Sequence, residues 1–255
     1  MKSALLGNPQ ADGANAWRSP PDTLLLHAGQ VHVWRISLDK PPAVRESLWQ
    51  TLSADEKERA GRYRFARDRQ AFITRRGRLR FILGSYLGLD PASLWFSYNP
   101  YGKPAIHPEV AAPICFNLSH SQGLALLAFA RQTDIGVDLE HLRVDFDHLE
   151  LAKRFFSAGE RAELNALPVA IRPQAFYLCW TRKEAFIKAH GEGLSLALDH
   201  FDVSLTPGEP ARLEATRAGL EAPDQWSMYN LEPAPDYLAA LAVRGQGCEV
   251  HCWAD

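Results

Sequence analysis

Three carboxylates and one lysine have the types and spacing to hold a metal ion next to a phosphate. Asp138 and Glu140 alternate in an apolar segment that begins at Ile135 and is typical of a strand, so both side chains should leave the same face. Glu184 and Lys188 lie four residues apart in a segment typical of a buried helix, which makes them neighbours. Crowded carboxylates favour a cation between them, and oxygen donors suit Mg²⁺. A solvated strand face and a simple Glu184–Lys188 ion pair are the alternatives.

A second cluster of polar groups follows the apolar segment 114–118. Ser119, His120 and Ser121 fall in a predicted turn before the next strand, 124–130. The Ser119 hydroxyl and the His120 ring N–H, with a backbone N–H, could hold phosphate oxygens. A serine–histidine nucleophile is less favoured, because adjacent residues at a strand end point apart and no Gly-x-Ser-x-Gly elbow is present.

Composition restricts the classes of function. The chain has 255 residues, 46% of them hydrophobic and 23% charged, which is typical of a globular protein with a real core. Its net charge is −2, although Asp55 to Arg80 carries ten Lys/Arg against four Asp/Glu. That basic stretch could meet a phosphate-bearing ligand or an acidic protein. No signal peptide or membrane span is apparent, so we expect a cytoplasmic protein. Cys248 and Cys252 have no partner pair for a zinc site, which favours ordinary thiols.

The chain divides into two halves with the same order of predicted elements. Each half reads as a strand, then helices, then strands, and each has a Ser-x-x-Glu helix start, at Ser53 and at Ser157. We therefore predict an α/β (α+β) fold of two similar subdomains with a ligand cleft between them. The predicted divisions are a loose extension over 1–27, a first subdomain over 28–132 and a second, with the metal site, over 133–255. The predicted elements are strands at 31–38, 94–98, 114–118, 124–130, 134–140, 201–205, 211–216, 226–231 and 238–243, and helices from Ser53, at 68–87, 147–166 and 172–190.

Five motifs in this order resemble the surfactin-type (Sfp-like) 4′-phosphopantetheinyl transferases, and together they cover residues from about 50 to 205. The motifs are Tyr101-Gly102-Lys103-Pro104, Phe116-Asn117-Leu118-Ser119-His120-Ser121, Gly136-Val137-Asp138-Leu139-Glu140, Phe155-Phe156-Ser157-x-x-Glu160, and Trp180-Thr181-x-Lys183-Glu184-Ala185-Phe186-x-Lys188 followed by Gly191-x-Gly193-Leu194.

The resemblance implies a pseudo-dimer in which each subdomain is a small antiparallel-rich sheet packed with helices, with coenzyme A in the cleft. It implies transfer of 4′-phosphopantetheine from coenzyme A to a serine of an apo acyl or peptidyl carrier protein, with release of adenosine 3′,5′-bisphosphate. The implied cofactor is Mg²⁺, with Mn²⁺ as the alternative. Carriers of fatty-acid, polyketide and non-ribosomal peptide synthesis all fit. We expect a monomer that binds neither nucleic acid nor membrane.

The resemblance also assigns roles by position. Asp138, Glu140 and Glu184 would be the metal ligands, and Glu184, Lys188 and Glu160 would be catalytic. Glu160 is the candidate general base, although it could equally complete a capping box with Ser157. The implied coenzyme A contacts are Arg59, Gly102, Lys103, Pro104, Ser119, His120 and Lys188, with Arg75 and Arg76 matched less closely.

Two other classes of function stay open at this point. A metal-dependent phosphodiesterase or nuclease also gathers carboxylates around Mg²⁺, but it needs a broad basic face for nucleic acid, and the basic stretch here is local. A non-catalytic module that binds a carrier protein or a nucleotide would have no need to keep three carboxylates and a lysine together.

Overall fold

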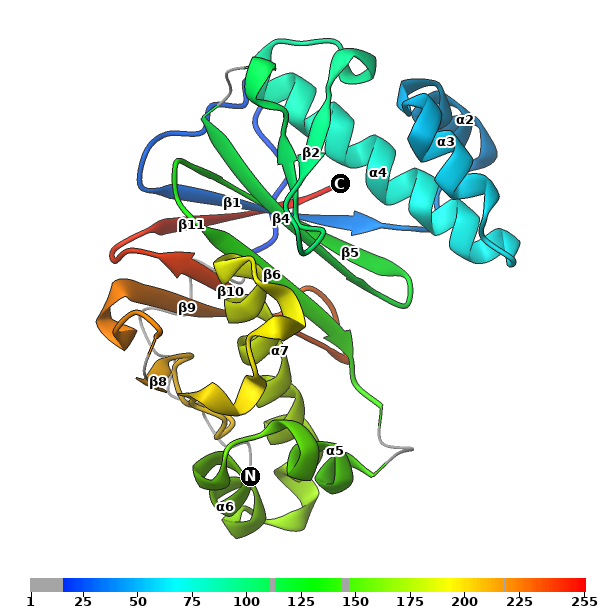
Figure 1. Ribbon diagram of the computed structural model, residues 1–255. Helices are drawn as coiled ribbons and strands as arrows, with labels where there is room; N and C mark the ends of the chain where they lie inside the picture. Colours follow the sequence, from blue (N-terminus) through cyan, green and yellow to red (C-terminus); the bar gives the residue numbers. More distant parts are fainter. Residues whose placement is uncertain (1–15, 111–112, 144–146, 218) are drawn as a thin grey trace.

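Two sheets lie next to each other, and each carries one long helix (Figure 1). The computed structural model describes residues 16–110, 113–143, 147–217 and 219–255. The first sheet has the order β11-β1-β5-β4, and the second has the order β6-β10-β9. Their strands are β1 (Gln30–Ser37), β4 (Ile114–Ser121), β5 (Leu124–Arg131), β6 (Ile135–His141), β9 (Trp226–Leu231), β10 (Tyr237–Arg244) and β11 (Glu249–Ala254).

The helices and two short hairpins complete the fold, and the mixed α/β prediction is confirmed. The hairpins are β2 (Phe96–Tyr98) with β3 (Pro104–Ile106), and β7 (Phe201–Val203) with β8 (Leu213–Thr216). The helices are α2 (Pro42–Thr51), α3 (Ala54–Gly61), α4 (Ala66–Leu87), α5 (His148–Phe155), α6 (Ala158–Ala166) and α7 (Arg172–His190).

The two halves of the chain repeat one strand order. In the first half β1 pairs with β5, which pairs with β4, and in the second half β6 pairs with β10, which pairs with β9. All four pairings are antiparallel. A short capped helix precedes the long helix in each half, α3 before α4 and α6 before α7. This shared order is what a pseudo-dimer would give.

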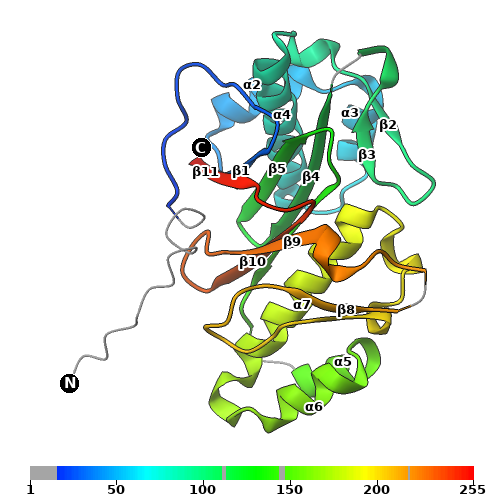
Figure 2. The ribbon, with the colours of Figure 1, turned by 90° about the vertical axis from the view of Figure 1, so that its left-hand side faces the viewer.

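One strand crosses between the halves and was missed by the sequence analysis. β11 pairs parallel with β1, so the last strand of the chain completes the first sheet, although it falls in the predicted second subdomain (Figure 2). The predicted loose extension is also held from Trp17 onward. The Trp17 indole donates to the Glu232 carbonyl, and the Arg18 backbone N–H donates to the Cys252 carbonyl. The part of that prediction that concerns residues 1–15 lies outside the described residues.

Two boundaries differ from the prediction for local reasons. The predicted helix 147–166 is two helices, because Phe156 is extended and Ser157 caps a new helix at its Glu160 N–H. The predicted turn 119–123 is shorter, since β4 runs through Ser121 and the turn is left to Gln122 and Gly123. His120 is therefore a strand residue.

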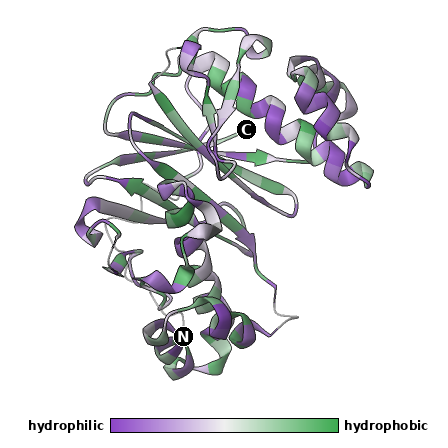
Figure 3. Ribbon diagram, viewed as in Figure 1, coloured by the Kyte–Doolittle hydropathy of each residue, from purple (hydrophilic) through white to green (hydrophobic). Residues whose placement is uncertain are grey.

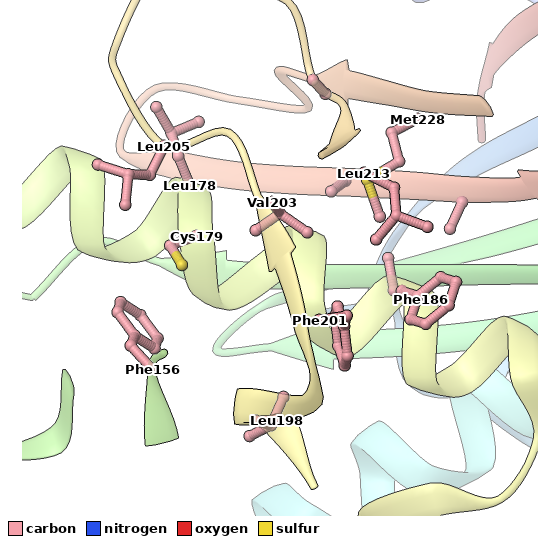
Figure 4. Packing of buried hydrophobic residues seen from close by; sticks show 14 of the residues in the cluster. Phe156, Leu178, Cys179, Phe186, Leu198, Phe201, Val203, Leu205, Leu213 and Met228 are labelled. Atoms are coloured by element: carbon pink, nitrogen blue, oxygen red, sulfur yellow. The ribbon is translucent and has the colours of Figure 1, made fainter. Parts of the chain in front are cut away.

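Apolar packing holds the two sheets and α7 together. Val33 of β1, Val137 of β6 and Leu241 of β10 belong to one buried cluster between the sheets. A second cluster surrounds α7, where the rings of Phe186 and Phe201 lie 4.6 Å apart (Figure 4). Burying one such phenylalanine contributes about 2–3 kcal/mol.

The outer surfaces are more polar than this interior. Figure 3 shows hydrophilic residues over much of α3 and α4, where the basic stretch lies. None of the helices in the described part of the chain is long and apolar enough to cross a membrane.

Candidate functional site

The candidate site lies where α7 crosses β6 at very close range. A Cβ atom placed on Gly136 of β6 would lie 2.1 Å from the carbonyl oxygen of Ala185 and 2.4 Å from the backbone nitrogen of Ala189. Any side chain at this position would force the two backbones apart, so glycine is required here. The contact sets α7 against the strand that carries Asp138 and Glu140.

Asp138 is the centre of this arrangement. It is 4% exposed, and its Oδ1 accepts hydrogen bonds from Lys188 Nζ at 2.7 Å and from Ser119 Oγ at 2.9 Å. Lys188 Nζ also lies 3.0 Å from Ser119 Oγ. The other oxygen, Oδ2, is buried and has no hydrogen-bond partner among the described residues. A buried carboxylate oxygen without a donor is costly, and a cation would satisfy it.

Glu140 and Glu184 are near enough to Asp138 to change each other's ionisation. Burial raises the pKa of Glu184 to about 7, and the charges of Asp138 and Glu140 add to this effect while Lys188 opposes it. Burial and then Asp138 also raise the pKa of Glu140, whose side chain accepts from Ser121 Oγ at 3.0 Å and bonds to Trp180. The structure thus brings together the three carboxylates that the sequence pointed to.

The donors of this group fit a hard divalent cation. They are carboxylate oxygens that repel one another, and one buried oxygen lacks a partner. As the side chains stand, no three His, Cys, Asp or Glu of the described residues are placed to hold a metal. The Lys188 ammonium holds Asp138 instead, in an ion pair of 2.7 Å. Lys188 is therefore paired with Asp138 here, whereas the four-residue spacing had left an ion pair with Glu184 as the alternative.

One face of β4 joins the two sheets at the site. Asn117 Oδ1 accepts from the Val137 N–H at 3.0 Å, Ser119 bonds to Asp138, and Ser121 Oγ accepts from the His141 N–H at 3.1 Å. These three residues alternate along β4, so they share a face. The sequence analysis did not assign Asn117, Ser121 or Trp180 to the site. The polar alternation Asn117-x-Ser119-x-Ser121 was the available signal.

A cationic row of Lys188, Arg75 and Arg59 leads into the first half of the chain, and His120 lies near Lys188 and Arg75. His120 is exposed to solvent on one side. The protein that surrounds its other side lowers the pKa of the imidazole, and the charges of Arg75 and Lys188 lower it further. Arg75 donates to the Tyr63 hydroxyl at 3.1 Å. Arg75 and Arg59 both lie over the Phe72 ring, with Cζ to centroid distances of 5.0 and 5.5 Å. Such a row suits a ligand with several phosphates.

Arg76 has a different role from its neighbour. It is 6% exposed and forms a buried ion pair with Glu56, which also binds Arg80 at 2.7 Å. Of the two loosely matched arginines, only Arg75 therefore lies in the cationic row.

Glu160 lies in a structural cluster. Its Oε2 accepts from the Ser157 N–H at 2.9 Å, which completes the capping box. Its Oε1 accepts from the Val203 N–H at 2.9 Å and pairs with Lys183 at 2.7 Å. Glu160 is 3% exposed and Lys183 is fully buried. Of the two readings of Glu160 left open by the sequence, this geometry favours the cap over the general base.

Gly102, Lys103 and Pro104 lie at the β2–β3 hairpin. Gly102 has a φ of +86°, which glycine adopts without strain. The Lys103 side chain reaches the second half of the chain, where Nζ donates to the Ala189 carbonyl at 2.9 Å. The ammonium of Lys103 is thus engaged by the end of α7.

Comparisons with known proteins match both halves of the chain. Residues 134–242 match the model of the 4′-phosphopantetheinyl transferase superfamily, and residues 41–132 match that of a 4′-phosphopantetheinyl transferase N-terminal domain. The 4′-phosphopantetheinyl transferase HetI of a Nostoc species is 42% identical over 240 residues, which are 94% of this chain and 98% of the relative. The 4′-phosphopantetheinyl transferase Sfp of Bacillus subtilis is 34% identical over 216 residues, 83% of this chain and 91% of the relative. The family resemblance of the motifs is thereby confirmed.

The raised pKa of Glu184 predicts how stability depends on pH. An unfolded glutamate has a pKa near 4.5, whereas that of Glu184 in the fold is about 7, so the native state holds the extra proton between these values. The free energy of unfolding should therefore fall as pH rises from 4.5 to 7. Glu184→Gln should remove a fall on the order of 3 kcal/mol. Urea titrations at pH 4, 6 and 8 measure the free energy of unfolding. The same change with pH in wild type and in Glu184→Gln would contradict the prediction.

The buried pair of Glu160 and Lys183 predicts a loss of stability from either single change. Glu160→Gln keeps a capping side chain but removes the charge that faces Lys183, which should lower the free energy of unfolding by about 3 kcal/mol. Adding Lys183→Met should cost less than the sum of the two single changes. Denaturant unfolding of the four proteins provides this cycle. A Glu160→Gln protein of unchanged stability but without enzymatic activity would restore the general-base role.

Proposed function

The chain belongs to the 4′-phosphopantetheinyl transferase superfamily, and on this premise we propose how its site works on coenzyme A. It is a 4′-phosphopantetheinyl transferase, an enzyme that modifies carrier proteins. We propose that it takes phosphopantetheine from coenzyme A, depends on Mg²⁺ and releases adenosine 3′,5′-bisphosphate. The observation that carries the proposal is the buried Asp138 next to Glu140, Glu184 and Lys188.

Asp138, Glu140 and Glu184 would hold the metal ion. Bound Mg²⁺ supplies neutralisation of the pyrophosphate charge in this kind of transfer. The unpartnered Oδ2 of Asp138 and the mutual repulsion of the three carboxylates support this assignment. Mn²⁺ takes the same oxygen donors and is the alternative ion.

Lys188 and the rest of the cationic row would hold the phosphates. Lys188 Nζ already lies between Asp138 and Ser119, and a lysine in this position can turn to a phosphate oxygen of the ligand. His120, with its lowered pKa, would be neutral and donate one ring N–H. Arg75 continues the row toward Arg59, which we assign to the 3′-phosphate. Charge neutralisation of this kind supplies most of the catalysis in phosphoryl transfer.

The carrier serine is the nucleophile, so the enzyme needs no covalent intermediate. A base must take the serine proton, and the best base has a pKa near the working pH. Glu184 does not meet this condition as a metal ligand, because a bound cation would lower the pKa of about 7 that it has without one. Glu160 does not either, because its oxygens are held by Lys183, Val203 and its own cap. We therefore assign Glu184 to the metal and assign proton removal to neither glutamate.

The remaining assignments concern the adenine region, the partner proteins and the state of the enzyme. Gly102, Lys103 and Pro104 would line the adenine region with backbone atoms, since the Lys103 ammonium is engaged elsewhere. Acyl and peptidyl carriers of fatty-acid, polyketide or non-ribosomal peptide synthesis are the proposed partners. We propose that the enzyme acts as a monomer in the cytoplasm.

Transfer to a carrier tests the proposal directly. The protein, coenzyme A, Mg²⁺ and an apo carrier should give a carrier whose mass has risen by one phosphopantetheine. Asp138→Asn should lower the rate at least about a hundredfold, because it removes the charge that Lys188 and the metal would share. The matched control is Glu163→Gln on α6, whose carboxylate binds Thr206 at 2.7 Å outside the site.

The proposal fails if no carrier of the three classes gains mass while coenzyme A still binds. Chelation by EDTA should abolish transfer, and added Mg²⁺ should restore it. Undiminished transfer by Asp138→Asn would remove the carboxylate site from the mechanism, even if the carrier were modified.

A further inference from the structure

The β2–β3 turn of the first half is bound to the end of the catalytic helix in the second half. Asn99 Nδ2 donates to the Gly191 carbonyl at 2.7 Å. Lys103 Nζ donates to the Ala189 carbonyl at 2.9 Å and to the Ile135 carbonyl at 3.4 Å. Two side chains from one turn thus contact Ala189 in the last turn of α7, Gly191 just after the helix, and the first residue of β6.

These contacts satisfy groups that a helix end leaves open. The last carbonyls of a helix have no intrahelical partner, and a cation near them is favourable. Burial lowers the pKa of Lys103, and its ammonium bonds to carbonyls. Among the described residues, no carboxylate lies within 4.0 Å of the Lys103 ammonium, whose partners are the two carbonyls. A buried ammonium held by helix-end carbonyls is typical of a structural contact, because it leaves few donors for a ligand.

The turn is internally braced, so its two contacts act as one unit. Asn99 Oδ1 accepts from the backbone N–H groups of Tyr101 and Lys103, at 3.0 and 2.8 Å. The same side chain therefore shapes the turn and binds Gly191. A Cβ on Gly191 would lie 3.4 Å from Lys103 Cδ and 3.5 Å from Asn99 Nδ2, and the φ of +89° there also favours glycine. The helix ends in the conformation that fits this turn.

The bound atoms belong to the two elements that form the site. Ala189 directly follows Lys188, which pairs with Asp138. Ile135 begins β6, which carries Asp138 three residues later. The turn thus holds the end of α7 to the start of β6 next to the Gly136 crossing. A shift of about 1 Å in a charged group at such a site can cost a hundredfold in rate.

We propose that Asn99 and Lys103 are positioning residues, which fix the end of α7 so that Lys188 meets Asp138 and the phosphate. They act through Lys188 and do not need to touch coenzyme A with their side chains. The kinetic part of this inference rests on the proposed function. The structural part, the fixing of the helix end, does not.

Three variants test the inference. Asn99→Asp keeps the oxygen that braces the turn but loses the donor to Gly191. Lys103→Met keeps the length of the side chain but loses the ammonium, and Lys103→Arg restores a cationic donor. Lys40→Met is the matched control, because its ion pair of 3.0 Å with Asp255 lies away from α7.

In transfer assays, Asn99→Asp and Lys103→Met should each lower kcat roughly tenfold, with KM for coenzyme A changed less than about threefold. The double variant should lose less kcat than the product of the two single fold-losses, since both side chains hold one helix end. Lys103→Arg should recover part of the loss, and Lys40→Met should match wild type. A Lys103→Met enzyme with raised KM and unchanged kcat would overturn the inference and make Lys103 a coenzyme A contact.

Amide hydrogen exchange tests the structural part without any turnover. Exchange at residues 187–191 should be faster in Asn99→Asp and in Lys103→Met than in wild type, while the middle of α7 stays protected. If wild type failed to modify any carrier, this measurement would still decide the inference. Unchanged exchange at the end of α7 in both variants would overturn it.

Discussion

The contact of the α7 backbone with β6 at Gly136 is the constraint on which the site depends. Without a side chain at Gly136, the helix lies so near the strand that a Cβ would sit 2.1 Å from the Ala185 carbonyl. Glu184 and Lys188 are thereby brought to Asp138 on the facing strand. The close contact is also costly, because it crowds one buried and two half-buried carboxylates and raises the pKa of Glu184 to about 7. A bound metal cation would offset that cost.

The long helices are held in place by a device that both halves share. In the first half, Glu56 completes a capping box with Ser53 and pairs with Arg80 of α4 at 2.7 Å. In the second half, Glu160 completes a capping box with Ser157 and pairs with Lys183 of α7 at the same distance. The first half lacks the three carboxylates, yet its Glu56 makes the same kinds of contact as Glu160. A buried glutamate in a family motif can therefore be structural. In each half, this glutamate fixes the rotation of the following long helix about its own axis.

Local patterns were enough to predict part of this account. Alternation placed Asp138 and Glu140 on one face of β6, and four-residue spacing placed Glu184 near Lys188. Partners distant in sequence were not predictable in the same way. The pairing of Lys188 with Asp138, of Glu160 with Lys183 and of β11 with β1 depends on how elements pack, which the spacing of residues in one element does not encode. Lys103 illustrates the limit, because its motif suggested a ligand while its ammonium holds a helix end.

The central claim is that a bound cation replaces Lys188 as the partner of the carboxylates, while Lys188 turns to a phosphate group. Anomalous diffraction from a crystal of the enzyme with coenzyme A and Mn²⁺ tests this most directly. The account predicts one Mn²⁺ peak in contact with Asp138, Glu140 and Glu184, with Lys188 Nζ moved from Asp138 to a phosphate oxygen. A peak elsewhere, or a Lys188 that stays on Asp138 with coenzyme A bound, would contradict it.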